Sequence, residues 1–289
     1  MNNIWSEYVQ GMNTLYLSKL LRFDDMFRPQ YEPLFNLDKD AKLRILEIGC
    51  GPGALAGALH RWYPKAEITA LDRDSNFIAF AKEHVPGVDF LEGDATALPF
   101  ADGVFDVVIS NTVAEHVEPA IFYTEQRRIL KKGGICLVLS ARRGIYQTAE
   151  CLKRTKDEED FWASAEDYKE KDRRYSVCRY PMSEQEMPIA MEANGFTRVS
   201  TGYAIINLTP DSDQYPAQMA EKMIEAQRHA ALDSVRLSGP DKESIARISE
   251  LVNEKYDTRL RLYREGKKQW DTAVSVTLVM RGVVPSDVI

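Results

Sequence analysis

Short apolar runs recur along the first half of the chain, and most of them are followed by a segment with helical spacing. The run at 42–48 alternates as a buried strand does, and residues 54–59 have the composition of the first turns of a helix. Further apolar runs lie at 68–71, 90–91, 105–110 and 135–140. A second helix is expected from about 119 to 130. This alternation is typical of an α/β fold built on a parallel sheet.

A turn with three glycines connects the first expected strand to its helix. Residues 46–53 read Leu-Glu-Ile-Gly-Cys-Gly-Pro-Gly, with the glycines at alternate positions. Glycine accepts positive φ and has no Cβ, so the backbone of such a turn can lie against a ligand. The helix that follows offers unpaired N–H groups to polar ligand atoms. The turn therefore predicts a site for a nucleoside-like cofactor.

The turn alone fits two kinds of cofactor. Gly49-x-Gly51-x-x-Ala54 also satisfies the pattern that seats a dinucleotide pyrophosphate on a helix start. Asp72 ends the next strand about twenty residues later, where a carboxylate would accept the ribose hydroxyls of either cofactor. Asp94 follows the third strand and is well placed to accept a hydrogen bond from an adenine amine.

Motifs further along the chain favour one of the two kinds of cofactor. Asn111-Thr112-Val113 and Glu115-His116 follow the fourth strand, and Lys131-Lys132-Gly133-Gly134 leads into the fifth. With the glycine turn and the two aspartates, these motifs resemble the class I S-adenosylmethionine-dependent methyltransferases, in the branch that mostly modifies small molecules. The resemblance runs from about Leu43 to Ser140 and is weaker at 181–203 and 270–282.

The resemblance implies a Rossmann-like, doubly wound sheet of seven strands, mostly parallel with an antiparallel last strand. It also implies methyl transfer from S-adenosylmethionine by in-line displacement, with S-adenosylhomocysteine as the product. Glu47 would act on the cofactor ammonium, Asp72 would hold the ribose and Asp94 the adenine. The residues expected at the cofactor are Glu47, Gly49, Cys50, Gly51, Gly53, Asp72, Arg73, Asp94, Ala95, Asn111 and Thr112.

The resemblance also places His116 near the transferred methyl group. This histidine is the first candidate for a base if the acceptor is an oxygen or nitrogen, and Glu115 is the second. Each residue has a structural alternative. A histidine near a helix start is more often a packing or capping residue than a catalyst. Asp72 and Asp94 could be turn or capping residues, although Asp74 and Ser75 are better placed to cap the helix after the second strand.

Specificity is expected from the residues outside the core. Residues 1–40 are interpreted as an N-terminal helical lid, in which Tyr8 or Tyr16 would reach the methionine carboxylate or the substrate. Residues 41–289 form the methyltransferase domain, with cap insertions at about 141–180 and 208–268. These insertions could cap the site or pack against another subunit.

Two residues after the fifth strand are candidates for substrate contact. Arg142 follows the carboxyl end of that strand and could hold a substrate carboxylate or phosphate, or pair with a surface acid. Tyr146 is one of several aromatic residues that could form the wall of an acceptor pocket or the small core of the insertion itself.

The amino-acid composition argues against several classes of binding partner. The chain of 289 residues has 44% apolar residues, a net charge of −7, four cysteines and four histidines. The acidic balance argues against a nucleic-acid substrate, and scattered cysteines and histidines predict no metal site. No apolar stretch has the length of a membrane helix, and the amino terminus lacks the pattern of a signal peptide. The expected protein is cytoplasmic, acts on a small molecule and is a monomer or homodimer.

Two other functions stay open. A protein with this turn could bind S-adenosylmethionine without catalysis, as a partner or regulatory subunit, although the intact carboxylates at 47, 72 and 94 argue against loss of function. It could also be an NAD-dependent oxidoreductase, if the glycine turn holds a pyrophosphate.

Overall fold

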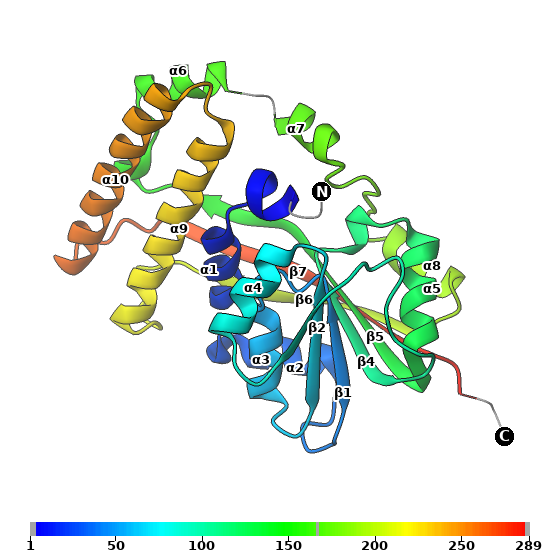
Figure 1. Ribbon diagram of the computed structural model, residues 1–289. Coiled ribbons are helices and arrows are strands. Elements are labelled where there is room, and N and C mark those ends of the chain that lie inside the picture. The colour runs from blue at the N-terminus through cyan, green and yellow to red at the C-terminus, as the bar shows by residue number, and fades with distance from the viewer. Residues whose placement is uncertain (1–3, 166–167, 287–289) are drawn as a thin grey trace.

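A twisted seven-stranded sheet forms the centre of the molecule (Figure 1). The computed structural model describes residues 4–165 and 168–286, and the sheet has the strand order β3-β2-β1-β4-β5-β7-β6. The strands are β1 (Arg44–Ile48), β2 (Glu67–Asp72), β3 (Asp89–Glu92), β4 (Phe105–Asn111), β5 (Leu130–Gln147), β6 (Thr197–Asn207) and β7 (Thr272–Val283). Strands β1 to β5 are mutually parallel, and β7 is antiparallel to both β5 and β6. The predicted fold class is confirmed.

Helices cover both faces of the sheet. The amino-terminal half contains η1 (Trp5–Val9), α1 (Met12–Arg22), η2 (Asp25–Phe27), α2 (Arg28–Phe35), α3 (Ala54–Trp62), α4 (Ser75–His84), η3 (Ala114–His116) and α5 (Pro119–Ile129). The other half contains η4 (Glu150–Leu152), α6 (Lys156–Ser164), α7 (Tyr168–Tyr175), α8 (Glu186–Ala193), α9 (Ala217–Ser238) and α10 (Lys242–Arg264). Side chains of α2, α3 and α4 form one apolar cluster with the sheet, and α5 and α8 form another on the opposite face.

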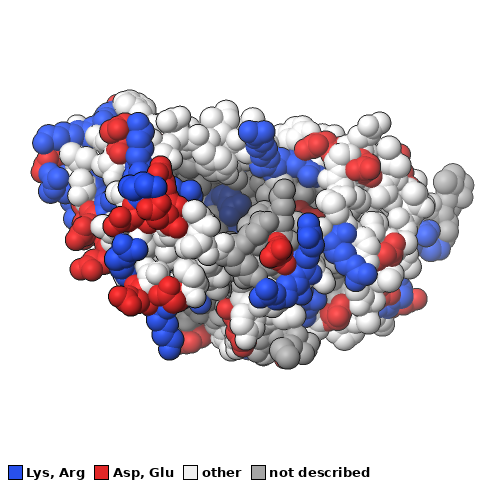
Figure 2. Space-filling view, turned by 90° about the horizontal axis from the view of Figure 1, so that it is seen from above, with Lys and Arg blue, Asp and Glu red and all other residues white. Residues whose placement is uncertain are grey.

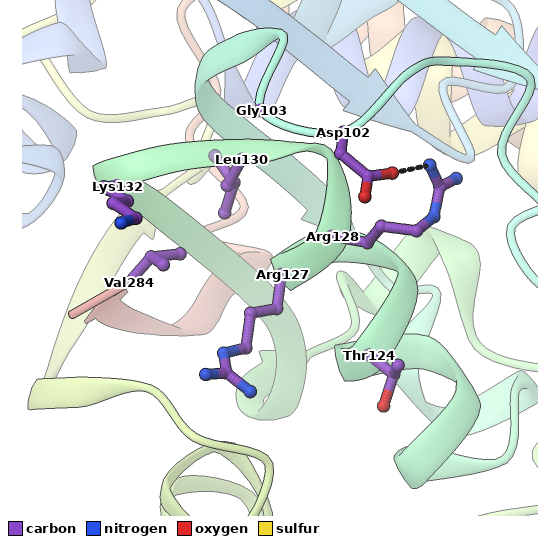
Figure 3. Close-up of a pocket in the computed structure, with 8 residues that line it drawn as sticks. All are labelled: Asp102, Gly103, Thr124, Arg127, Arg128, Leu130, Lys132 and Val284. Carbon is purple, nitrogen blue, oxygen red and sulfur yellow. Dashed lines mark hydrogen bonds and ion pairs between the residues drawn. The ribbon is translucent and has the colours of Figure 1, made fainter. Parts of the chain in front are cut away.

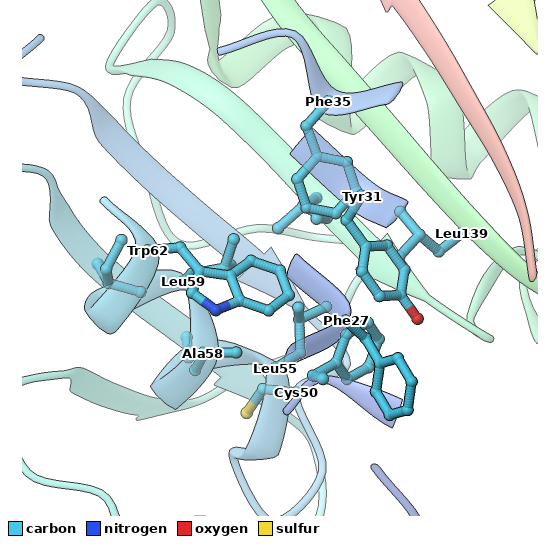
Figure 4. Close-up of a cluster of buried hydrophobic side chains, with 14 of the residues drawn as sticks. Phe27, Tyr31, Phe35, Cys50, Leu55, Ala58, Leu59, Trp62 and Leu139 are labelled. Atoms are coloured by element: carbon cyan, nitrogen blue, oxygen red, sulfur yellow. The ribbon is translucent and has the colours of Figure 1, made fainter. Parts of the chain in front are cut away.

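The first cluster is rich in aromatic rings. Tyr31 of α2 stacks on Trp62 of α3 with ring centroids 5.7 Å apart, and it also contacts Phe23 and Phe35 (Figure 4). Large rings remove the most apolar surface from water per residue, so this contact contributes strongly to the attachment of the amino-terminal helices. The segment before β1 is therefore part of the core.

The carboxyl-terminal half adds a helical hairpin beside the sheet. Helices α9 and α10 pack along each other, and α6 packs on α10 around a small cluster of Phe161, Val235, Ile248 and Val252 (Figure 1). The fifth strand is longer than the expected 135–140, because residues 141–147 continue it against β7. Within 4–165 and 168–286, no helix has both the length and the apolar character needed to cross a membrane.

Candidate functional site

The glycine turn between β1 and α3 has the backbone that its sequence predicts. Gly49, Gly51 and Gly53 have φ of +67°, +55° and +85°. A Cβ on Gly49 would lie 2.4 Å from Cγ2 of Val113, and one on Gly53 would lie 2.8 Å from the Phe90 ring. Glycine is required at these two positions for its φ and for its lack of a side chain. The N-cap residue of α3, Gly53, has no side chain to cap the helix, and the Ala56 N–H in its first turn opposes the effect of burial, which raises the pKa of the nearby Glu47.

A matched pair of substitutions tests the close approach at Gly49. Gly103 has φ of +65° but has open space where a Cβ would lie. Left-handed φ should cost either alanine variant about 1–2 kcal/mol of unfolding free energy. Gly49→Ala adds a clash worth about 1–3 kcal/mol, and it should also weaken S-adenosylhomocysteine binding. Urea unfolding and calorimetric titration of both variants check this. If Gly49→Ala and Gly103→Ala lose the same unfolding free energy and bind S-adenosylhomocysteine equally well, the turn has no special role.

Two carboxylates lie at the ends of adjacent strands beside the turn. Glu47, in β1, is fully buried, and neither of its oxygens has a hydrogen-bond partner among the described residues. Asp72, at the end of β2, accepts the Gly51 N–H at 2.8 Å and the Asp74 N–H at 2.9 Å. Since β1 and β2 pair with Ile48 opposite Leu71, these acids flank the same turn.

Lys19 of α1 completes this group. Its side chain is buried, and its Nζ would lie 3.9 Å from a Cβ placed on Gly51. Burial lowers the pKa of Lys19, and the nearby Glu47 raises it. Burial raises the pKa of Glu47 to about 8, while Lys19 opposes that shift. The pKa of Asp72 is also raised by burial, against the effect of its two backbone hydrogen bonds. An ionisable acid and an ionisable base therefore lie at the turn without a direct ion pair within 4 Å.

Sequence reasoning missed Lys19. Met12 and Leu15 have the spacing of an apolar helix face, and position 19 continues that face by one more turn. The sequence contained a signal for it. A lysine at a helix position where the spacing predicts an apolar residue indicates a buried partner, because lysine is almost never fully buried alone.

The remaining cofactor positions lie around the turn with different exposures. Cys50 is buried in the first apolar cluster, and burial raises the pKa of its thiol. Asp94 is exposed, and one of its oxygens accepts the N–H and hydroxyl of Thr96. Arg73 is exposed and Ala95 is half-buried. Asp74 accepts N–H bonds from Asn76 and Phe77, so it is the cap of α4 and leaves Asp72 to the turn.

The end of β4 carries the next candidates. Asn111 is buried, and Thr112 has φ of +56°, a left-handed conformation that is costly for a β-branched residue. The Thr112 N–H donates to Leu139 O at 2.8 Å and its hydroxyl donates to Asn111 O at 2.6 Å. Such strain is concentrated at functional sites in proteins. Contact of Asn111 and Thr112 with the cofactor stays a prediction.

His116 and Glu115 lie in the short helix η3. The Cys178 N–H donates to Nδ1 of His116 at 2.9 Å, and the His116 ring contacts Trp5 edge-on. With Nδ1 accepting, the neutral ring carries its proton on Nε2, which then has no lone pair for a substrate proton. Glu115 accepts from Ser140 Oγ at 2.8 Å, and its other oxygen is buried without a hydrogen-bond partner among the described residues. Glu115 is therefore the better placed acceptor of a proton.

The remaining candidates lie on separate elements. Tyr16 packs its ring against Phe80 and His84 of α4. Arg142 donates to Met182 O at 3.3 Å, and its Nε lies 3.3 Å from a Glu184 oxygen. Tyr146 is 68% exposed on the extended part of β5. The ligand roles of all three stay predictions.

Another hollow lies at the opposite end of the sheet (Figure 3). It is lined by the end of α5, the start of β5 and the residues before β4, including Arg127, Arg128 and Asp102. Arg128 pairs with Asp102 at 2.9 Å and with Glu125 at 2.8 Å, so its charge is neutralised within the chain. Ligands of open α/β sheets bind at the carboxyl ends of the strands. The glycine turn is therefore the better candidate site.

The match with known families lies in the same part of the chain. Residues 46–138 match the family described as "Methyltransferase domain". A probable phthiotriol/phenolphthiotriol dimycocerosates methyltransferase 2 of Mycobacterium ulcerans is 44% identical over 95 residues, which is 32% of this chain and 36% of that protein. A fatty-acid O-methyltransferase of Mycolicibacterium smegmatis is 41% identical over 103 residues, 34% of this chain and 37% of the other. The chain thus spans little more than a third of the length of these two relatives.

The fold is similar to solved structures over most of the chain. A phosphoethanolamine N-methyltransferase 2 of Haemonchus contortus aligns with a TM-score of 0.51 and 16% identity, over 91% of this chain and 53% of that one. The YcgJ protein of Bacillus subtilis aligns with a TM-score of 0.50 and 20% identity, over 90% and 99%. The match to the methyltransferase-domain family is thus confined to residues 46–138, within the part of the chain that forms β1 to β5. That segment contains the glycine turn, Asp72, Asp94 and η3.

Proposed function

We propose that the protein is an S-adenosylmethionine-dependent methyltransferase that acts on a small molecule. The observation that carries the proposal is the buried pair of Glu47 and Lys19 at a turn of positive-φ glycines. The methionine part of the cofactor has one ammonium and one carboxylate, so an acid and a base at one turn match its two charges. The acceptor atom, whether oxygen, nitrogen, sulfur or carbon, stays open.

The residues of the turn fit this cofactor. The unpartnered oxygens of Glu47 would accept from the ammonium, and Lys19 would donate to the carboxylate. Asp72 has two backbone partners and keeps further lone pairs for ribose hydroxyls. The second carboxylate oxygen of Asp94 accepts no hydrogen bond from the described residues and would accept the adenine amine. S-adenosylhomocysteine, the product, keeps the ammonium and the carboxylate but not the sulfonium charge, and would bind at the same positions.

When bound, the cofactor supplies a methyl group that is already activated on a sulfonium. The chain then has to align an acceptor with that methyl group and exclude water. Asn111 and Thr112 would form the floor, and the hairpin of α9 and α10 would cover the site. An oxygen or nitrogen acceptor that must lose a proton would pass it to Glu115, or to His116 if the Cys178 contact opens.

We further infer that the protein is cytoplasmic, does not bind nucleic acid, and is a monomer or homodimer. The net charge of −7 supports the second point, because nucleic acids attract basic surfaces. The names of the two relatives, which act on lipid-like small molecules, support a small acceptor.

A thermal-shift comparison tests the cofactor. S-adenosylhomocysteine at a hundredfold excess over its dissociation constant should stabilise the protein by about 2.7 kcal/mol, and NAD should not. Stabilisation by NAD alone would overturn the proposal in favour of an oxidoreductase. Formation of S-adenosylhomocysteine with any acceptor would exclude a purely binding role.

The pKa of Glu47 predicts a pH dependence of cofactor binding. Because burial raises this pKa to about 8, the free protein holds the carboxyl in its neutral form at lower pH. Binding an ammonium requires the carboxylate, so affinity for S-adenosylhomocysteine should rise with pH towards 8, by up to about tenfold per pH unit. The Glu47→Gln variant should bind more weakly and without this slope. Calorimetric titration at several pH values measures both, and an unchanged slope in the variant would refute the assignment.

A further inference from the structure

Arg22, the last residue of α1, is a half-buried cation without an acidic partner. Its Nε donates to Ser18 O and its Nη2 donates to Ser18 Oγ, both at 3.1 Å. No carboxylate lies within ion-pair distance of it among the described residues. Burial lowers the pKa of Arg22. Placing a guanidinium out of water without a counter-charge is costly, and the cost is recovered when an anion binds.

Two tyrosines from other elements lie near Arg22. The ring of Tyr31 in α2 packs against Phe23, the residue that follows Arg22, and both Tyr31 and Tyr146 of β5 raise the pKa of Arg22 against the effect of burial. Tyr31 is fully buried, and its hydroxyl has no hydrogen-bond partner among the described residues, although it lies beside Thr277 of β7. Figure 4 shows this hydroxyl pointing away from the Trp62 ring that packs on it. A buried hydroxyl whose one polar neighbour leaves it without a full hydrogen bond can form one with a bound group.

This cluster lies next to the cofactor site. Arg22 follows Lys19 by three residues, so the two cations lie on one side of α1 and about 4.5 Å apart along its axis. Thr277 of β7 pairs with Ala141 of β5, two residues after Leu139, which pairs with Asn111 of β4. Seen from above, the molecule has a central hollow with a Lys or Arg side chain at its base (Figure 2). Lys19 lies beside the glycine turn, and Arg22 lies at the carboxyl end of the same helix.

We propose that Arg22 and the Tyr31 hydroxyl bind an anionic group of the methyl acceptor, a carboxylate or a phosphate. This inference rests on the proposed function, because it places the acceptor beside a bound cofactor. The guanidinium can donate two parallel hydrogen bonds to either anion, and the tyrosine donates a third. Tyr146, which is mostly exposed, stands at the outer side of the group and contacts the rest of the acceptor.

A purely structural role for Arg22 gives different expectations. Its bond to Ser18 O places a positive charge at the carboxyl end of α1, where a cation stabilises a helix. In that case, replacing Arg22 changes stability and leaves anion binding unaltered.

The test is calorimetric titration of the full chain saturated with S-adenosylhomocysteine. The probes are octanoate, octyl phosphate and the neutral octanamide, and the proteins are wild type, Arg22→Gln, Tyr31→Phe and the control Arg28→Gln, whose native arginine pairs with Glu32 on α2. We expect wild type and Arg28→Gln to bind one of the anions at least about tenfold more tightly than octanamide. Arg22→Gln should lose that preference and Tyr31→Phe should reduce it, while S-adenosylhomocysteine binds all four proteins alike. The preferred anion distinguishes a carboxylate from a phosphate.

The outcomes separate the two proposals. Wild-type protein that does not bind S-adenosylhomocysteine defeats the proposed function itself. Wild type that binds it but does not prefer either anion over octanamide overturns the anion site alone, as does an undiminished preference in Arg22→Gln. If Arg22→Gln does not fold, Tyr31→Phe decides, because it removes a single oxygen that makes no hydrogen bond within 3.5 Å in the fold.

Discussion

Replacing Lys19 by methionine is expected to weaken binding of S-adenosylhomocysteine by about 30- to 1000-fold, that is, by roughly 2–4 kcal/mol. The ammonium is buried at the glycine turn, where a carboxylate of the ligand would be desolvated. Methionine has a similar length and no charge, so the carboxylate would enter an apolar site without a donor. Calorimetric titration at neutral pH measures the loss directly.

Two further variants make this prediction specific to position 19. Lys65 is an exposed lysine that pairs with Asp40, so Lys65→Met should bind the ligand like wild type. The double variant Lys19→Met with Glu47→Gln removes both buried charges and should be at least as stable as Lys19→Met alone, because Glu47 loses its counter-charge in the single variant. If the Lys19→Met variant is folded and binds S-adenosylhomocysteine as tightly as wild type, Lys19 is not part of the binding site.

The parts of the site that could be predicted from the sequence are encoded within short segments. Gly49 and Gly53 belong to a turn whose backbone is available only to glycine, and Asp72 is the last residue of the strand that positions it. Local signals of this kind are independent of the rest of the fold. They sufficed for the sheet, the turn and the cap of α4.

Residues that reach the site from distant segments could not be predicted in this way. Lys19 lies 28 positions before Glu47, and Tyr31 meets Thr277 only because α2 packs on β7. The extension of β5 to Gln147 likewise depends on pairing with β7, which comes more than a hundred residues later. A sequence pattern shows that such a residue is unusual in its helix, but not which strand it will face.

The largest loss of stability is expected from Arg259→Met in α10. The Arg259 guanidinium is fully buried, and it donates to Asp271 at 2.9 Å through Nε and to Asp211 at 2.9 Å through Nη2. Asp211 also accepts the N–H groups of Gln269 and Trp270, both at 2.7 Å. Removing the one cation leaves two buried carboxylates, which should cost about 3–5 kcal/mol of unfolding free energy. Urea unfolding at neutral pH measures this difference.

Arg264→Met is the matched control, because Arg264 lies five residues later in the same helix and pairs with Glu221 at 2.7 Å in an exposed position. An exposed pair contributes about 0–1 kcal/mol. The Arg259 variant should also bind S-adenosylhomocysteine more weakly, since α10 packs on α9, and Asp233 of α9 accepts a hydrogen bond from Thr14 on the helix that carries Lys19. If Arg259→Met and Arg264→Met lose similar amounts of unfolding free energy, the buried group of Arg259, Asp211 and Asp271 does not stabilise the hairpin of α9 and α10. A loss of stability with unchanged ligand affinity would show that the hairpin does not position α1, and the route from Arg259 to the cofactor would then be wrong.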